Sequence, residues 1–196
     1  LLTHPRAEHE LRRLVGLLDV PTVAVLGNHD LAISRDPQAR PSNLRELAPA
    51  LLLGDEGCML ELRGRRVWVA GVHPRLIVRC LPRVDPNSLV PPPEAGEPGL
   101  RILLCHYPRV LDELEPGAFD LVLAGHMHDG QICIPYPGGK IRLAHPRASY
   151  TAGVYRSQAA TLHVSPGLGT TFVPFRLAAR PEATELVLRT AAPAVR

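Results

Sequence analysis

Three short apolar runs in this chain end directly on polar side chains. Residues 22–26, 102–105 and 121–124 are rich in Val, Leu, Ile and Ala, as is typical of buried strands in an α/β sheet. The side chains that follow these runs are Asn28-His29-Asp30, His106 and His126-Met127-His128. The pattern predicts that one edge of a sheet carries a concentration of imidazole and amide groups.

Other segments predict elements that surround these strands. Leu11, Leu14, Val15 and Leu18 recur at helical spacing, which predicts an amphipathic helix within residues 7–19. Ser42 or Asn43 is expected to cap a second short helix that carries Leu44 and Leu47, and residues 110–114 suggest another brief helix.

Residues 58–62 and 67–71 alternate between apolar and other side chains, with Gly64 between them, and so predict a hairpin. Later strands are predicted at residues 131–134, 160–164 and 184–188. Residues 73–99 and 135–157 are expected to be loops that shape the specificity of any site at the sheet edge.

The length of 196 residues and the 45% content of hydrophobic residues predict one domain, residues 1–196, of the α/β class. In such sheets the carboxyl ends of the strands build the site. We therefore expect Asn28, His29, His106, His126 and His128 to converge. Imidazole nitrogen suits zinc or iron, and an amide oxygen suits manganese.

A single histidine after a strand is more often a structural residue than a ligand. The combination of His-x-His after one strand with Asn-His-Asp after another favours a metal site, because close imidazoles repel one another when protonated. The remaining histidines lack a partner motif and are expected to have structural or solvent roles; they are His4, His9, His73, His145 and His163.

Charge and aromatic content indicate which binding partners are favoured, and cysteine spacing indicates the state of the thiols. The net charge of +3 is spread over single or paired arginines, and aromatic residues make up 4% of the chain, so a nucleic-acid partner is not favoured. No apolar run approaches the roughly 20 residues of a transmembrane helix. Cys58, Cys80, Cys105 and Cys133 form no C-x-x-C pair, which favours reduced thiols and leaves a disulfide open. We expect a protein of the cytoplasm or the membrane periphery.

The chain resembles the calcineurin-like metallophosphoesterases in three ordered motifs: Gly27-Asn28-His29-Asp30, Cys105-His106 and Gly125-His126-Met127-His128. Two further segments resemble the bacterial phosphodiesterase branch of that family. They are Asp129-Gly130-Gln131, and Ser165-Pro166-Gly167-Leu168-Gly169-Thr170 leading to Arg180-Pro181-Glu182.

The resemblance implies a four-layer α/β/β/α sandwich and two divalent ions (Mn, Fe or Zn) bridged by a hydroxide that attacks phosphorus. It implies that Asn28, His106 and His126 bind the second metal and that His128 binds the first. It also implies that His29 stabilises or protonates the scissile phosphoester and that Asp30 orients the His29 imidazole.

The family's Asp-x-His and Gly-Asp-x-x-Asp motifs do not appear among the 26 residues before Gly27. Those motifs supply the remaining ligands, so we expect an N-terminally incomplete domain that lacks its first strands and binds at most one ion, weakly. Asp129 stands where many relatives have glycine, and is expected to contact either metal or water.

These features predict a hydrolase of phosphomonoester or phosphodiester bonds, with a small molecule or a lipid head group as substrate. The alternative is a non-catalytic interaction module that keeps the fold without a complete two-metal site. A nuclease is less favoured, because the sequence lacks a basic patch with interleaved aromatics.

Overall fold

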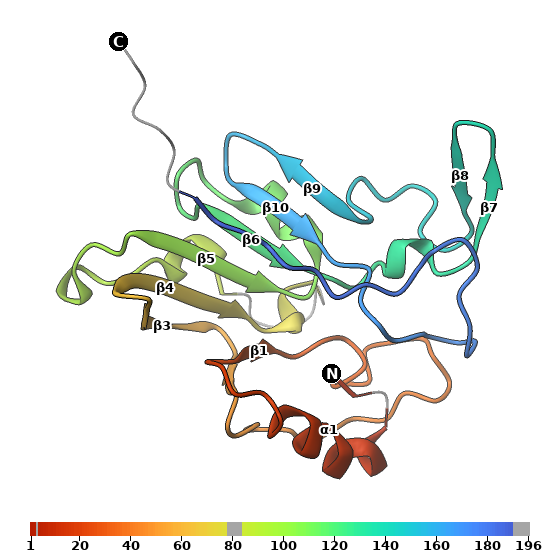
Figure 1. The fold of residues 1–196 in the computed structure, drawn as a ribbon, viewed down its shortest axis with the longest axis horizontal. Coiled ribbons are helices and arrows are strands. Elements are labelled where there is room, and N and C mark those ends of the chain that lie inside the picture. The colour runs from red at the N-terminus through yellow and green to blue at the C-terminus, as the bar shows by residue number, and fades with distance from the viewer. Residues whose placement is uncertain (3, 78–83, 190–196) are drawn as a thin grey trace.

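A six-stranded mixed sheet forms the centre of the protein (Figure 1). The computed structural model describes residues 1–2, 4–77 and 84–189. In spatial order the strands are β3 (Glu56–Leu62), β4 (Arg65–Val72), β5 (Leu100–Cys105), β6 (Leu121–Ala124), β10 (Thr161–Val164) and β9 (Gly153–Arg156). The four inner strands run parallel, and β3 and β9 pair antiparallel at the edges. This arrangement fits the predicted α/β class.

The register of the parallel strands brings their carboxyl ends to one level. Val72 on β4 pairs with Cys105 on β5, and Cys105 in turn lies opposite Ala124 on β6. The residues that follow β5 and β6 therefore leave the sheet side by side. This register places two of the predicted motifs at one edge.

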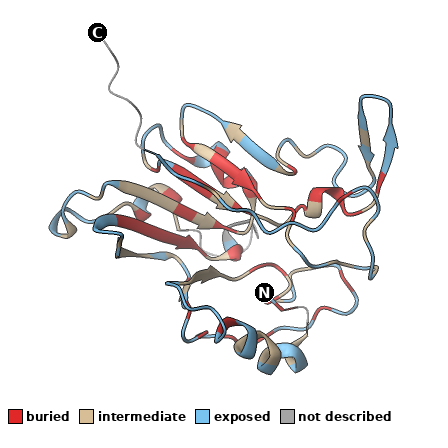
Figure 2. Ribbon diagram, in the orientation of Figure 1, coloured by how far each residue is buried: buried red, intermediate tan, exposed pale blue. Residues whose placement is uncertain are grey.

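The two faces of the sheet pack against different cores. Trp68, Ala70 and Val72 on β4 belong to the larger core, together with fully buried Leu103 and Leu162. The alternate positions, Val67 and Val69, pack with Leu53 and the strands of a second sheet. Figure 2 shows that buried residues gather in the inner strands. A strand buried on both faces explains why β4 reads as an almost continuous apolar run.

The second sheet consists of two parallel strands, β1 (Val23–Val25) and β2 (Leu51–Leu53). Its outer face is covered by the helix α1 (Glu8–Val15), whose Val15 packs with Leu44 and Leu47. The helix predicted within residues 7–19 is confirmed, and it covers the shorter range Glu8–Val15. Helix, small sheet and large sheet thus form successive layers (Figure 1).

The longer connections contain short 3-10 helices. The predicted loop 73–99 includes η2 (Pro74–Ile77), η3 (Pro86–Leu89) and η4 (Pro93–Ala95), while residues 78–83 of that loop lie outside the described part. The brief helix predicted near 110–114 is η5 (Pro108–Glu113). Two further turns are η1 (Pro5–Ala7) and η6 (His128–Gly130).

Two predicted elements are wrong. The helix expected after Ser42 does not form, because the Ser42 amide and hydroxyl both donate to the carbonyl oxygen of Asp30, at 2.7 and 3.2 Å. Leu44 and Leu47 are nevertheless buried as expected. Residues 184–188 form no strand in the structure. At Ser42 the local pattern gives way to tertiary contacts, whereas Val187 and Leu188 lie exposed to solvent.

The predicted loop 135–157 contains more regular structure than expected. β7 (Cys133–Tyr136) and β8 (Gly139–Arg142) pair as an antiparallel hairpin that projects from the body (Figure 1), and β9 lies within the same range. The strands predicted at 131–134 and 160–164 correspond to β7 and β10. The hairpin turn falls at Pro137-Gly138, where Gly138 adopts a positive φ of 95°.

Three cysteines are described, and each carries a free thiol: Cys58, Cys105 and Cys133. Cys80 lies outside the described residues. Burial raises the pKa of the Cys105 thiol to about 12, so this side chain acts as a small core residue. Of the helices within the described ranges, none has the length and apolar character needed to cross a bilayer.

Candidate functional site

Three strand ends bring Asn28, His106 and His126 into contact. His106 Nε2 lies 2.7 Å from Asn28 Oδ1, and His126 Nδ1 lies 3.1 Å from His106 Nε2. Asn28 follows β1, whereas His106 and His126 follow the neighbouring strands β5 and β6. This convergence at the carboxyl edge is the one that the sequence pattern predicts.

Burial keeps both imidazoles of this cluster neutral. Burial, followed by the nearby His126, lowers the pKa of His106 to about 2. Burial, followed by His145, lowers the pKa of His126 to about 4. At neutral pH each ring is therefore uncharged; the accepting Asn28 oxygen puts the His106 proton on Nε2, and a bound ion would have to displace that proton to use this nitrogen as a ligand.

Gly27 leaves the space that His106 occupies. A Cβ atom at position 27 would lie 2.9 Å from His106 Cε1 and 3.0 Å from its Nδ1. Real Cβ atoms hardly ever approach another atom so closely, so any larger residue would displace the imidazole. Gly27 thus allows the close contact between His106 and Asn28.

The segment after β6 holds several non-glycine residues in left-handed conformations. His126 has a φ of 71°, His128 of 48°, Asp129 of 52° and Gln131 of 51°. Such conformations cost roughly 1–3 kcal/mol each and tend to cluster at functional sites. The strain turns the side chains of this segment in different directions.

His128 lies on the wall of the same pocket but has its own partners. Its Nδ1 is 3.2 Å from the carbonyl oxygen of Gly169 and 3.4 Å from Arg176 Nη2. A carbonyl only accepts, so the shorter contact puts the proton on Nδ1 and the lone pair on Nε2. Burial and the Arg176 guanidinium lower the pKa of His128 to about 4.

His29 and Asp30 make different sets of contacts. His29 Nε2 lies 3.1 Å from both Ser34 Oγ and Thr171 Oγ1. The Asp30 carboxylate is fully buried and accepts from the backbone amides of Leu2 and Gly27, each at 2.7 Å. Asp30 therefore holds the turn after β1, and its expected role in orienting the His29 imidazole stays a prediction.

Asp36, Thr171 and Gln131 join the site, although no sequence pattern pointed to them as partners of His29. Thr171 Oγ1 donates to Asp36 Oδ2 at 3.1 Å, and the amide of Phe172 donates to the same oxygen at 2.9 Å. Gln131 Nε2 donates to the carbonyl oxygens of Thr171 and Val173. These bonds fix the loop that carries Thr171 against His29.

Asp129 does not face the imidazole cluster. Its buried carboxylate forms ion pairs with Lys140 and with Arg142, the latter at 3.1 Å. The sequence analysis left metal and water open as partners of Asp129, and the structure gives it two cations of β8. Asp129 therefore links η6 to the hairpin.

His145 is a neighbour of the site that the sequence analysis set aside. Its ring centroid lies 5.4 Å from that of His126. Tyr107 also packs edge-on against the His126 ring, with a centroid distance of 4.6 Å. His145 belongs to the irregular segment after β8, where no periodicity marks its position. Of the other histidines without a partner motif, His4 caps η1 and His163 is buried within β10.

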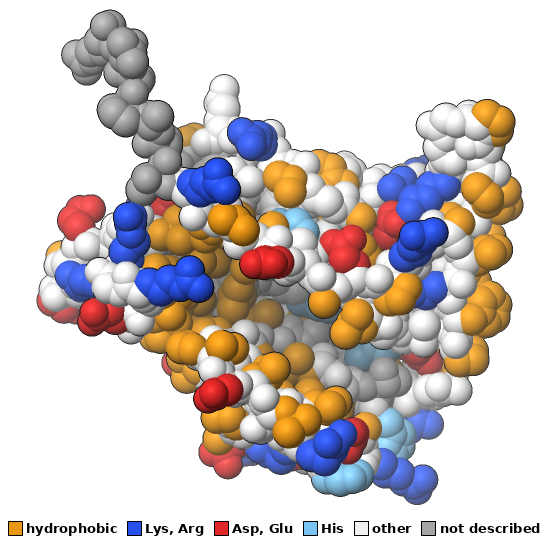
Figure 3. Space-filling model, in the orientation of Figure 1, with side chains coloured by type: hydrophobic (Ala, Val, Ile, Leu, Met, Phe, Trp, Pro, Cys, Tyr) orange, Lys and Arg blue, Asp and Glu red, His pale blue; other side chains and the backbone are white. Residues whose placement is uncertain are grey.

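Apart from Asp30, the predicted site residues that follow β1, β5 and β6 line a pocket of about 510 Å³. It is lined by Leu1, Leu2, Gly27, Asn28, His29, His106, Gly125, His126, His128 and residues 165–170. A second cavity of about 330 Å³ continues from it along the sheet face, between Val23, Val25, Leu104 and Leu123. Figure 3 shows the molecule hollowed between the α1 layer and the six-stranded sheet.

The donor set suits a single divalent ion better than two. Two neutral imidazoles and an amide oxygen converge, which is a nitrogen and oxygen set that zinc, iron and manganese accept. Within residues 1–2, 4–77 and 84–189, no three or more His, Cys, Asp or Glu side chains gather in an arrangement that would hold a metal. The cluster could therefore supply only part of a coordination sphere, and it contains no carboxylate.

Comparison with known proteins identifies relatives across most of the chain. It is 26% identical over 162 residues to the uncharacterized metallophosphoesterase YkoQ of Bacillus subtilis, a match that covers 82% of this chain and 57% of YkoQ. It is 30% identical over 182 residues to the uncharacterized protein YpbG of the same organism, covering 90% of this chain and 61% of YpbG.

A third relative is the phosphodiesterase YaeI of Escherichia coli, 26% identical over 169 residues, which cover 86% of this chain and 58% of YaeI. The chain thus spans less than two thirds of the length of each of these relatives. No family model and no solved structure matches it.

Proposed function

We propose that this chain, which belongs to the metallophosphoesterase family, takes part in the metal-dependent hydrolysis of phosphomonoester or phosphodiester bonds. The observation that carries the proposal is the contact of Asn28, His106 and His126 at 2.7 and 3.1 Å. Residues from three separate strand ends meet there with neutral donor atoms. The names of the relatives support the reaction class.

Asn28 Oδ1 and one nitrogen each of His106 and His126 would hold a divalent ion. When bound, such an ion neutralises charge on phosphoryl oxygens and lowers the pKa of water. His128, whose Nδ1 bond to Gly169 leaves the lone pair on Nε2, is the proposed ligand of a further ion that would bind only in the complete enzyme, whereas this chain would hold one ion at most. The four-layer sandwich belongs to the same proposal.

His29 is the proposed group beside the reacting phosphate. It lines the pocket next to Asn28, and hydroxyl groups of Ser34 and Thr171 hold its Nε2. Burial lowers the pKa of His29, which makes the neutral ring the resting form. The neutral ring can donate a hydrogen bond to a phosphoryl oxygen, and once protonated beside the substrate anion it can pass that proton to a leaving oxygen.

The pocket supports a small phosphoester or the head group of a lipid as the substrate. Its volume of about 510 Å³ accommodates a compact molecule. Gly125, Gly167 and Gly169 are part of its lining and have no side chain that would fill it. Arg176 stabilises this wall by donating to the carbonyl oxygens of Pro166 and Gly169, at 2.7 and 2.6 Å.

Hydrolysis of bis-p-nitrophenyl phosphate and p-nitrophenyl phosphate in the presence of Mn²⁺ tests the proposal. We expect Mn²⁺-dependent turnover by this chain, at least about 100-fold slower in His126→Ala and in His29→Ala. The exposed-helix variant His9→Ala is the matched control and should retain activity. Turnover that His126→Ala leaves unchanged, or none with either substrate, would contradict the proposal.

A non-catalytic interaction module is the second candidate function. It is favoured by the lack, among the described residues, of a metal-holding cluster of three or more His, Cys, Asp or Glu side chains. This candidate predicts a folded chain that fails to hydrolyse either ester at any Mn²⁺ concentration. The same assay therefore separates the two functions.

A further inference from the structure

The β7–β8 hairpin is a two-stranded sheet that lies outside the central sheet. β7 pairs with β8 so that Ile134 lies opposite Ile141, and the pairing continues where Leu143 N donates to Ile132 O at 3.0 Å. On the other side of β7, residues 175–177 attach through an isolated bridge between Ile132 and Leu177, in which Cys133 N donates to Leu177 O at 2.8 Å. We call residues 131–143 and 175–177 the apolar ribbon.

One face of the apolar ribbon carries large apolar side chains. Strand alternation and the pairing of Ile132 with Leu177 place the same-face positions in register. These residues are Ile132, Ile134, Tyr136, Ile141, Leu143, Phe175 and Leu177. All of them except Ile132 are between 50% and 55% exposed. Solvent-facing strand positions are ordinarily polar, so a face of this kind marks an interaction site.

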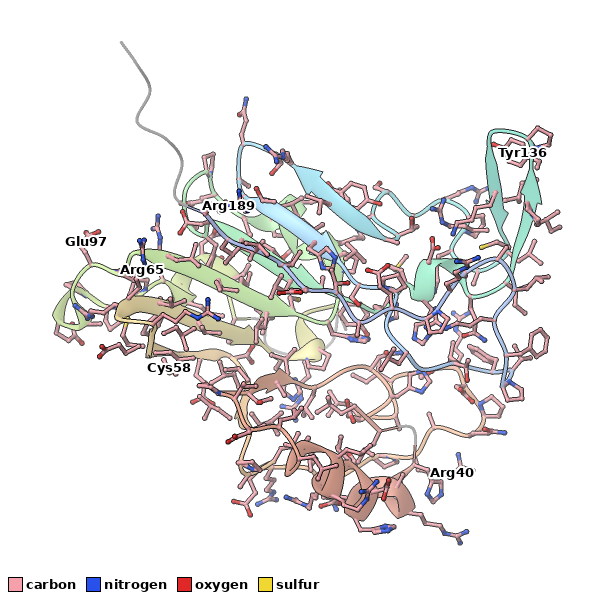
Figure 4. All side chains as sticks on the ribbon, in the orientation of Figure 1. Arg40, Cys58, Arg65, Glu97, Tyr136 and Arg189 are labelled. Atoms are coloured by element: carbon pink, nitrogen blue, oxygen red, sulfur yellow. The ribbon has the colours of Figure 1, made fainter. Side chains whose placement is uncertain are left out.

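The figures place this face at the margin of the molecule. Tyr136 is labelled in Figure 4 near the tip of the hairpin, and its ring lies against Gly139 of the facing strand. Figure 3 shows hydrophobic side chains gathered along the same margin. The ribbon is thus a projection rather than the wall of a groove.

The opposite face of the apolar ribbon carries cations. Lys140, Arg142 and Arg176 alternate with the apolar positions, and the carboxylate that pairs with the first two is Asp129. Arg180 and Glu182 line the same cavity as Asp129, Lys140 and Arg142, so the cations still outnumber the carboxylates behind the apolar face. An apolar face with aromatic residues, backed by basic residues, is the amphipathic composition of segments that bind the membrane interface.

We propose that the apolar ribbon docks on the surface of a bilayer that contains anionic lipids. Ile134, Ile141 and Tyr136 enter the boundary between head groups and acyl chains, while the surplus positive charge attracts anionic head groups. The facing backbone groups of β7 and β8 pair with each other, and docking at the level of the head groups leaves the groups on the outer edges in contact with water.

A bilayer fits this surface better than a protein partner does. The same-face positions include no charged side chain that would fix the orientation of a specific partner, and a projecting tip needs no complementary cavity in a fluid interface. The inference stands independently of the proposed hydrolysis, because it concerns residues outside the imidazole cluster and is tested by binding alone.

Co-sedimentation with vesicles tests the inference, using phosphatidylcholine alone and phosphatidylcholine mixed with phosphatidylglycerol. We expect this chain to bind the mixed vesicles more strongly, and the double variant Ile134→Thr/Ile141→Thr to partition roughly tenfold less. The matched control is Val20→Thr/Val187→Thr, which alters two exposed valines elsewhere and should bind as the parent does. Circular dichroism checks that both variants are folded.

Two further measurements sharpen the outcome. In a Tyr136→Trp variant, vesicles should shift the indole emission to shorter wavelength as the ring leaves water. Absence of binding to both kinds of vesicle would overturn the inference, as would equal binding by the Ile134→Thr/Ile141→Thr variant. A dimer of the parent in light scattering that this variant abolishes, with no vesicle binding, would assign the face to self-association instead.

Discussion

His106 Nε2 lies 2.7 Å from Asn28 Oδ1, although 78 positions separate the two residues in the sequence. The contact exists because β1 and β5 both end at the same edge of the fold and because Gly27 leaves room for the ring. An amide oxygen and an imidazole nitrogen held at this distance are two ligands of the proposed metal centre. The position of the ring is therefore sensitive to very small changes at residue 27.

Gly27→Ala should weaken metal binding without unfolding the chain. The added methyl group would overlap the His106 ring, which must then move away from Asn28. We expect Mn²⁺ affinity to fall about tenfold or more, a loss of the size caused by displaced ligands. Calorimetric titration measures it. Gly99→Ala is the control, because its methyl group would meet its nearest atom at an ordinary 3.6 Å; equal affinities in both variants would refute this account.

Thr171→Val should reduce turnover through His29. The substitution removes the hydroxyl that lies 3.1 Å from both His29 Nε2 and Asp36 Oδ2. Because Thr171 positions the imidazole and does not itself bind substrate, we expect kcat to fall roughly 10- to 100-fold with KM nearly unchanged. Thr171→Ser should restore most of kcat. A rise in KM alone, or failure of serine to rescue, would show that the role of Thr171 is merely structural.

Asp36 should make the stability of the fold depend on pH. Burial pulls the pKa of Asp36 upward, but hydrogen bonds from the amides of Phe172 and Gln38 and from Thr171 outweigh it, so the pKa lies below its ordinary value of 3.8. A lowered pKa stabilises the folded state above pH 3.8, and this contribution disappears as the pH falls through the folded-state pKa.

Asp36→Asn should accordingly lower the free energy of unfolding at pH 7, by on the order of 1 kcal/mol. The difference from the parent should shrink as the pH falls below 3.8. Urea unfolding at pH 7 and at pH 3 measures both quantities. If the parent and Asp36→Asn differed in free energy of unfolding by the same amount at both pH values, the charge of Asp36 would not be the source of the stabilisation.

The sequence predicted the strands and the convergence of their ends because these depend on local pattern. Apolar runs of four or five residues predict buried strands, and parallel strands deliver their following residues to one edge, so Asn28, His106 and His126 were expected to meet. The metal-binding roles of these residues and of His128 stay predictions. So do the catalytic roles of His29 and Asp30.

What the sequence did not predict depends on contacts between irregular segments. Asp36 binds the amide of Phe172 across 136 positions, and neither residue lies in a periodic pattern. The helix expected after Ser42 fails because Ser42 bonds to Asp30 instead of capping a helix. The proline and glycine residues near the hairpin turn favour a loop from residue 135 onward, and so conceal the end of β7 and the whole of β8, where each strand has only four residues.

Titration with Mn²⁺, followed by the loss of the free-ion electron paramagnetic resonance signal, tests the central claim most directly. The parent chain should bind one Mn²⁺ ion, His126→Ala should lose that binding, and His9→Ala should retain it. Binding of one ion that depends on His126 would establish the cluster of Asn28, His106 and His126 as a metal centre. Equal binding by the parent and His126→Ala, or no binding by the parent, would contradict it.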